Sequence, residues 1–284
     1  MKIEFENVCY IYDDGGASGV KALSDINLKV QDNEFIGVIG ATGSGKSTLM
    51  QHMNGLLKAS SGIITCDGKN IYDKDYSLKK LRDRVGLVFQ YPEHQLFEMT
   101  VFDDVCFGPK NQGLAPDEIK QRATDALRLT GISEEYYESS PFDLSGGQKR
   151  RVAIAGVLAM CPEVLVLDEP AAGLDPAGKK EIFDNIRKLK EERKITVILV
   201  SHSMEDVAEY VDRLIVMNKG QIVFDDKTAN VFKNVEELEA IGLAVPEVSY
   251  IMRDLKGAGF DVSLDALTVE SATDEIIRAL KRFV

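Results

Sequence analysis

A glycine-rich turn, Gly40-Ala-Thr-Gly-Ser-Gly-Lys-Ser47, constrains the fold of this chain more than any other feature. The residues before it, Phe35–Ile39, are apolar apart from one glycine and predict a buried strand, whereas those from about Lys46 onward predict a helix. Glycines let the backbone curl so that successive N–H groups face one anion, and the start of the helix adds a favourable dipole. A strand, such a turn and a helix in this order predict a loop that binds the phosphates of a nucleotide.

The turn ends in two side chains suited to ATP and Mg²⁺. The ammonium group of Lys46 is expected to reach the β- and γ-phosphates, and the hydroxyl of Ser47 is expected to ligate the metal ion. The chain is acidic, with a formal net charge of −12 at pH 7, and this balance argues against a nucleic-acid partner. It does not argue against ATP, because phosphate sites rely on backbone N–H groups and one or two cations.

A second motif lies much further along the chain, where the apolar run Val164–Leu167 is followed by Asp168 and Glu169. Alone, this pattern describes any buried strand that ends in a solvated turn. Together with the phosphate loop, it predicts that Asp168 holds Mg²⁺ through water and that Glu169 polarises the water that attacks the γ-phosphate.

Hydrophobic patterning predicts an α/β fold built around a mainly parallel sheet. The apolar runs Val164–Leu167 and Thr196–Val200 are separated by a polar helical stretch, Ala177–Arg193, which is typical of a parallel sheet covered on both faces. Alternating runs near the N-terminus predict an antiparallel β subdomain. Helical spacing dominates between Val101 and Met160. The expected parts are an ATPase domain over 1–224, a helical subdomain within it at about 91–162, and a small C-terminal extension over 225–284.

The residues Leu144-Ser-Gly-Gly-Gln148 stand immediately before a helix-forming run, Lys149–Met160. On their own they would be an ordinary helix start capped by Ser145. They lie twenty residues before Asp168, and in this position they resemble the signature motif of ABC ATPases, whose glycines and helix N-terminus approach an anion. The residues expected to contact the ATP of a partner subunit are Leu144, Ser145, Gly146, Gly147 and Gln148.

This resemblance implies roles for further residues. Gln90 matches the glutamine that senses Mg²⁺ and contacts the membrane subunit, and His202 matches the histidine that touches the γ-phosphate. Asp175 matches the D-loop residue that crosses to the partner. Tyr12 matches the aromatic residue that stacks on adenine, although Tyr10 has the same strand parity and competes for this role. The predicted ATP-binding residues are Tyr12, Gly40, Ala41, Thr42, Gly43, Ser44, Gly45, Lys46, Ser47 and Thr48, the metal ligands Ser47, Gln90 and Asp168, and the catalytic residues Glu169, His202 and Gln90.

The segment after Gln90 narrows the resemblance. Tyr91–Phe97 and Val101–Pro109 resemble the energy-coupling factor transporters, which import vitamins and some metal ions, and Arg150–Met160 agrees. The run Tyr-Pro-Glu-His in particular looks like the second of the two different ATPases of the vitamin systems, with the cobalt and nickel ATPases as the alternative. Without the resemblance, this segment would be a plain loop with one buried aromatic residue. With it, the segment forms part of a groove that receives a helix of a transmembrane coupling protein.

The resemblance also implies an assembly. Two ATPase subunits, expected to differ, face each other head to tail, with each ATP between the phosphate loop of one and the signature motif of the other. A transmembrane coupling protein and a separate substrate-binding membrane protein complete the complex, and the C-terminal extension is expected to help hold the ATPases together. No apolar run approaches the ~18 residues of a spanning helix, so the chain is expected at the cytoplasmic face of the membrane. The alternatives are a soluble ABC ATPase acting on DNA or ribosomes and a P-loop kinase.

Overall fold

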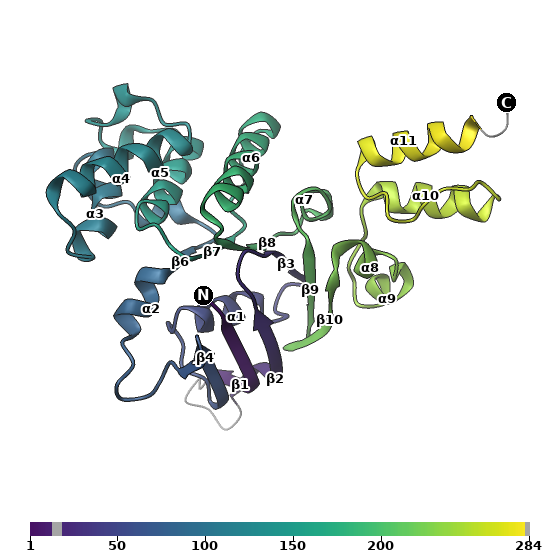
Figure 1. Cartoon of the computed structure of the whole chain (residues 1–284), viewed down its shortest axis with the longest axis horizontal. Helices are drawn as coiled ribbons and strands as arrows, with labels where there is room; N and C mark the ends of the chain where they lie inside the picture. The colour runs from purple at the N-terminus through teal and green to yellow at the C-terminus, as the bar shows by residue number, and fades with distance from the viewer. Residues whose placement is uncertain (13–18, 282–284) are drawn as a thin grey trace.

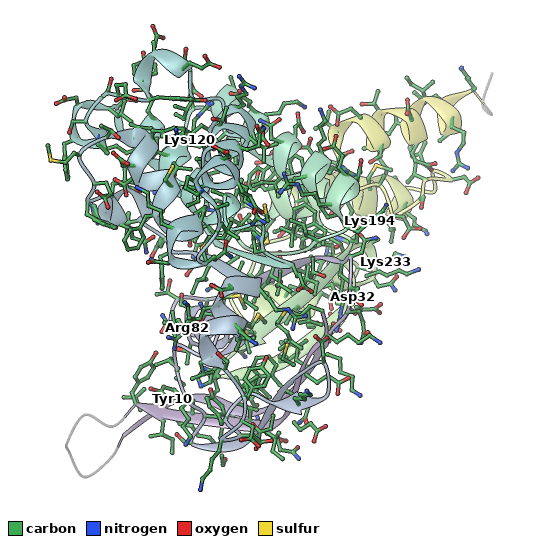
Figure 2. All side chains as sticks on the ribbon, turned by 60° about the vertical axis from the view of Figure 1, so that its left-hand side comes forward. Tyr10, Asp32, Arg82, Lys120, Lys194 and Lys233 are labelled. Atoms are coloured by element: carbon green, nitrogen blue, oxygen red, sulfur yellow. The ribbon has the colours of Figure 1, made fainter. Side chains whose placement is uncertain are left out.

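The computed structural model describes residues 1–12 and 19–281. An antiparallel N-terminal sheet lies beside a central, mainly parallel sheet, with a group of helices on one side and the C-terminal helices on the other (Figure 1). Figure 2 shows Lys120, in the first group of helices, and Tyr10, in the N-terminal sheet, at opposite ends of the view. The α/β class predicted from the sequence is confirmed.

The N-terminal sheet forms because its strands alternate buried apolar side chains with exposed polar ones. It runs in the order β2-β1-β4-β5 with antiparallel pairing throughout. Its apolar face packs with the helix α1 (Lys46–Met53) in one hydrophobic core. The strands are β1 (Ile3–Tyr12), β2 (Val20–Val30), β4 (Ser61–Cys66) and β5 (Lys69–Asn70).

The central sheet runs in the order β10-β9-β3-β8-β7-β6, and every neighbouring pair except β10 and β9 is parallel. Its strands are β3 (Phe35–Gly40), β6 (Val85–Val88), β7 (Val164–Asp168), β8 (Thr196–Val200), β9 (Arg213–Asn218) and β10 (Gln221–Lys227). Both faces are covered, so Ile36 and Ile39 of β3 are fully buried in different cores. Parallel strands end at the same edge, so the residues that follow β3, β6, β7 and β8 meet there.

Helices connect these strands and build the predicted helical subdomain. The helix α6 (Pro176–Arg193) follows β7, and α7 (Met204–Tyr210) follows β8. A separate group of helices lies between β6 and β7 in the chain, as the sequence predicts for about 91–162. The remaining helices up to this point are α2 (Leu78–Arg84), η1 (Pro92–Gln95), α3 (Val101–Asn111), α4 (Pro116–Leu129), η2 (Glu134–Tyr136), η3 (Pro141–Asp143) and α5 (Gly146–Leu158).

The predicted boundary after residue 224 falls inside β10, which continues to Lys227. The side chains of Phe232 and Leu238 beyond it are buried in the main core, whereas Met252 belongs to a small core of its own. The small core of its own therefore lies after about residue 245, although Leu267 from this part is buried in the main core. Among the described residues, no helix is long and apolar enough to cross a membrane. The C-terminal helices are α8 (Thr228–Phe232), α9 (Val235–Ala240), α10 (Glu247–Gly257) and α11 (Val269–Leu280).

Candidate nucleotide-binding site

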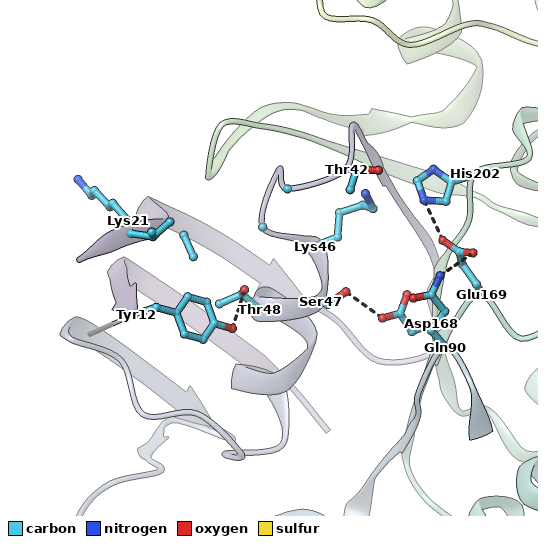
Figure 3. A pocket seen from close by; sticks show the side chains of 14 residues that line it. Tyr12, Lys21, Thr42, Lys46, Ser47, Thr48, Gln90, Asp168, Glu169 and His202 are labelled. Carbon is cyan, nitrogen blue, oxygen red and sulfur yellow. Dashed lines mark hydrogen bonds and ion pairs between the residues drawn. The ribbon is translucent and has the colours of Figure 1, made fainter. Parts of the chain in front are cut away.

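A cavity of about 360 Å³ lies where the central strands end next to the N-terminal sheet. It brings together the phosphate loop, the residues after β7 and His202 after β8 (Figure 3). Its described lining residues are Tyr12, Val20, Lys21, Ala22, Thr42, Gly43, Gly45, Lys46, Ser47, Thr48, Gln90, Asp168, Glu169 and His202. Residues far apart in the sequence thus meet as the rule for parallel strand ends requires.

The phosphate loop adopts a shape that only glycine permits at its end. Gly45 precedes α1 with a φ of 102°, and a side chain on it would come within 2.5 Å of the backbone oxygen of Ala22. The next residue, Lys46, is 7% exposed, and its Nζ donates to the carbonyl oxygens of Gly40 at 2.7 Å and Ala41 at 3.1 Å. Burial lowers the pKa of Lys46, while the charges of nearby carboxylates oppose that shift. The buried ammonium group of Lys46 therefore lies against the loop.

Ser47 and Asp168 place two oxygen atoms side by side beneath this cation. The hydroxyl of Ser47 donates to Oδ2 of Asp168 at 3.0 Å. Asp168 is 8% exposed, and burial raises its carboxyl pKa, while the bond from Ser47 and the charge of Lys46 act in the other direction. Hard divalent cations such as Mg²⁺ select oxygen ligands of this kind.

Glu169 lies at the junction of the strand ends. Its carboxylate accepts a hydrogen bond from Nε2 of Gln90 at 3.3 Å and lies 2.8 Å from Nε2 of His202. Its backbone N–H donates to the carbonyl of Val200 at the end of β8, and its φ of 51° is unusual for a residue with a side chain. The backbone of β7 and β8 thus directs this carboxylate toward the cavity. The structure brings the three predicted catalytic residues, Glu169, His202 and Gln90, into one cluster.

Of the two tyrosines that competed for the adenine-stacking role, Tyr12 is the one that lines the cavity. It is 40% exposed, and its hydroxyl lies 3.2 Å from the hydroxyl of Thr48 (Figure 3). Tyr10 instead packs edge-on against His52, with ring centroids 4.8 Å apart. The stacking role of Tyr12 stays a prediction, but its position favours it over Tyr10.

The signature motif lies outside this cavity. Ser145 caps α5 by accepting from the N–H of Gln148 at 3.3 Å, and the side chain of Gln148 accepts from the N–H of Ser145 at 3.0 Å. Asp175 caps α6 by accepting from the N–H of Gly178 at 2.7 Å. Both motifs line a separate hollow of about 380 Å³, together with Arg151. One chain therefore presents a phosphate loop and a signature motif on different surfaces.

Sequence reasoning missed Val20, Lys21 and Ala22, which line the cavity from β2. They reach it because β1 and β2 pair so that Tyr12 lies opposite Val20. This register depends on pairing between strands, and no local pattern in the sequence signals it.

Comparison with known proteins agrees with this geometry. The sequence pattern of the ABC transporter family matches residues 23–172. The chain is 53% identical over 281 residues to the energy-coupling factor transporter ATP-binding protein EcfA2 of Caldanaerobacter subterraneus, covering 99% of this chain and 98% of the relative. It is 52% identical over 282 residues to the protein of the same name from Clostridium perfringens, covering 99% of each.

Solved structures give the same picture. cbiO1 from Clostridium perfringens, part of the ABC transporter complex cbiONQ, superposes with a TM-score of 0.73 at 42% identity, covering 88% of this chain and 98% of that one. The ATP-binding cassette MJ0796, a dimer in a post-hydrolysis state with ADP and phosphate, gives a TM-score of 0.73 at 30% identity, covering 80% and 98%.

The chain therefore belongs to the ABC transporter ATPases and, within them, to the ATP-binding proteins of energy-coupling factor transporters. The predicted resemblance and the predicted ATPase class are confirmed.

Proposed function

We propose that this chain binds ATP with Mg²⁺, hydrolyses it as one of a pair of ATPases, and so drives the import of vitamins or other micronutrients. The observation that supports this best is the convergence of Lys46, the Ser47–Asp168 pair and the Glu169–His202 pair in one cavity. That set supplies a cation for phosphate, oxygen ligands for a metal and a carboxylate for water.

The residues present fit Mg²⁺. The Ser47 hydroxyl and the Asp168 carboxylate, 3.0 Å apart, would hold the ion directly or through water, with the side chain of Gln90 nearby in the same cavity. When bound, Mg²⁺ supplies charge that offsets that of the phosphates. A pair of oxygen donors, with the Asp168 carboxylate buried and the Ser47 hydroxyl open to the cavity, at the end of a loop of this shape suits this ion.

Three residues of this chain then have separate roles in hydrolysis. Lys46 exchanges its bonds to Gly40 and Ala41 for the β- and γ-phosphates, which the same Nζ can reach because it already stands over the loop. Glu169 draws a proton from the attacking water, and His202 contacts the γ-phosphate. The 2.8 Å contact between them holds the Glu169 carboxylate beside the His202 ring.

The partner is a second ABC ATPase, expected to be a different one. The signature residues Ser145 and Gly147 line a hollow separate from the ATP cavity of their own chain, so the anion that they approach belongs to another subunit. Asp175 borders the same hollow and would face that subunit. The solved cassette MJ0796 is itself described as a dimer with ADP and phosphate.

The membrane partner is a transmembrane coupling protein on the cytoplasmic face of the cell membrane, joined in the complex by a substrate-binding membrane protein. Phe97 and Phe107 are 56% and 40% exposed, contact each other edge-on at 4.8 Å, and border a hollow of about 180 Å³. Tyr91, in the same segment before Phe97, is 55% exposed. An exposed aromatic group around a hollow suits a docked helix.

Co-purification from membranes in mild detergent, with ATPase assays of the product, tests this function. A tagged chain should bring down an ATPase and a membrane protein, and Phe97→Ala should reduce the membrane protein by roughly tenfold, as loss of a central aromatic anchor does. Phe142→Ala is the matched control, because Phe142 is 64% exposed on η3 away from the hollow. Recovery of a soluble complex without a membrane protein, or equal recovery by the Phe97 variant, contradicts the proposal.

A cobalt or nickel importer is the second candidate, because cbiO1 is 42% identical to this chain over most of its length. The identity of the co-purified substrate-binding protein, and whether it retains a vitamin or a metal ion, separates the two.

A further inference from the structure

Arg150 lies on α5, here called the signature helix because it begins at the signature motif, and its side chain binds the segment that follows β6. Its side chain is 5% exposed. Nη2 donates to the backbone carbonyl of Gln90 at 3.1 Å, while Nε and Nη2 face the two carboxylate oxygens of Glu93 at 3.3 and 3.4 Å. One guanidinium thus meets both the start of the segment and its 3₁₀ turn η1, just before the exposed Phe97.

The other side of Gln90 faces the nucleotide cavity. Its side-chain amide donates to Glu169 at 3.3 Å, while its carbonyl accepts from Arg150. Glu169 stands among the residues proposed for hydrolysis, and Arg150 follows the helix cap Ser145 by five residues. A single residue, Gln90, is therefore bonded to the hydrolytic cluster and to the signature helix at once.

We propose that Arg150 is a positioning residue that fixes the Gln90–Phe97 segment to the signature helix, so that the segment and the signature motif change position together when the nucleotide site does. The inference rests on the proposed function and adds a residue that no motif assigned. An arginine suits this task because its planar fork holds two acceptors in fixed directions, whereas a lysine ammonium is a point charge without that geometry.

The remaining nitrogen of Arg150, Nη1, is buried and has no hydrogen-bond partner among residues 1–12 and 19–281. A buried donor without a partner is unfavourable, so the bonds from Nε and Nη2 to Glu93 and to the Gln90 carbonyl must hold the guanidinium in this position.

The neighbouring arginine, Arg151, makes different contacts. Arg151 extends to a different part of the molecule, where its Nη1 donates to Glu181 of α6 at 2.8 Å and to the carbonyl of Thr130 at 3.3 Å. Successive positions on α5 thus fix different segments, and only the first of them reaches Gln90.

Hydrogen exchange and steady-state kinetics of the co-purified complex test the inference with Arg150→Gln. We expect amide exchange over 90–97 to rise by about tenfold, and added ATP no longer to protect the start of α5. We also expect kcat to fall by about tenfold, with KM and ATP affinity changed by less than about threefold, because binding is kept and positioning is lost. Arg150→Lys keeps the charge without the fork, so its exchange and kcat should lie between those of Arg150→Gln and the unchanged protein.

Arg128→Gln is the matched control, because Arg128 forms an ion pair with Glu134 at 2.7 Å in the same group of helices, with both side chains more than 60% exposed. If Arg150→Gln does not fold, Glu93→Gln, which changes the other member of the ion pair, provides the test. The same rise in amide exchange over 90–97 is expected. Unchanged exchange there, or ATP protection of α5 that persists, overturns the inference. If Glu169→Gln loses turnover but the Arg150 variants behave normally, only the positioning role of Arg150 is overturned. If the wild-type complex does not hydrolyse ATP, the proposed function is overturned.

Discussion

The phosphate loop and the signature motif of this chain are built in opposite ways. The first site uses buried charges below 10% exposed, Lys46 at the start of α1 and Asp168 at the end of β7. The second uses the start of a helix, with Ser145 and Gly146 exposed and no acidic side chain in the first turn. The first site can bind a ligand within one chain. The exposed helix start would contact a ligand only when the partner subunit presents one. Substitutions at the phosphate-loop site should therefore impair the isolated chain, whereas substitutions at the signature motif should impair only the pair.

The largest difference between the two sides is expected from Glu169→Gln. The amide keeps the size of the side chain and can still bond with Gln90 and His202, but it has no negative charge to draw a proton from water. Hydrolysis should slow by about 10²–10⁴-fold, while ATP binding stays near normal. The variant should accumulate as a closed, ATP-filled pair, measured as nucleotide retained per pair after gel filtration.

That experiment must include the partner ATPase, whose own site can turn over independently. Glu192→Gln, at an exposed position near the end of α6, provides the control and should hydrolyse ATP normally. Near-normal turnover at the chain's own site in Glu169→Gln would show that another group activates the water.

Lys46→Ala should weaken nucleotide binding itself. A charge-assisted hydrogen bond contributes about 1.5–3 kcal/mol, so the loss of this ammonium should raise the Kd for ATP by roughly 10–100-fold. Titration with a fluorescent ATP analogue on the isolated chain measures this, and the variant should never form the closed pair. Lys188→Ala, which removes an exposed lysine from α6, should bind as the wild type does. Equal affinities for both variants would remove Lys46 from the phosphate site.

The sequence predicted where the residues proposed for hydrolysis lie, Glu169 from the apolar run before it and Gln90 and His202 from the resemblance to ABC ATPases, and parallel strands end at one edge. Glu169 and His202 could be assigned to one cluster on that ground, and they lie 2.8 Å apart. The pair of Arg150 and Glu93 could not be predicted this way. Neither residue is in a strand, and the contact between them depends on how η1 packs against α5.

The C-terminal boundary was also beyond sequence reasoning. The end of β10 carries Asp225, Asp226 and Lys227, whose exposed side chains hide the strand from any hydrophobic pattern. Only tertiary contacts show that Phe232 and Leu238 complete the main core. This changes how the role of the extension should be tested, because a cut after Phe224 removes part of that core.

Truncation after Val245 should separate pairing from folding. It removes α10 and α11 with their small core and Leu267 of the main core, and leaves Phe232 and Leu238 in place. The shortened chain should remain folded, bind ATP normally and lose pairing in the absence of nucleotide by at least about tenfold, since the exposed Ile251, Ile277 and Leu280 are lost. Light scattering without nucleotide measures the pairing.

Truncation after Phe224 is the informative comparison, because it should lower thermal stability sharply by opening the main core. Unchanged nucleotide-free pairing after the cut at Val245 would show that the extension only stabilises its own chain.

The smallest effect is expected from Ser145→Ala, and it probes the signature side directly. Its hydroxyl is a neutral partner that would meet phosphate only in the pair, and one such bond contributes about 0.5–1.5 kcal/mol, or roughly 2- to 10-fold. ATP binding by the isolated chain should not change, because Ser145 lies outside its own cavity. In the Glu169→Gln background, the ATP concentration needed to form the closed pair should rise by that factor.

Ser140→Ala removes a similar cap from η3 and controls for loss of capping alone. A Ser145 variant that weakened ATP binding by the single chain would show that the two surfaces are not independent, and would break the comparison on which this expectation rests.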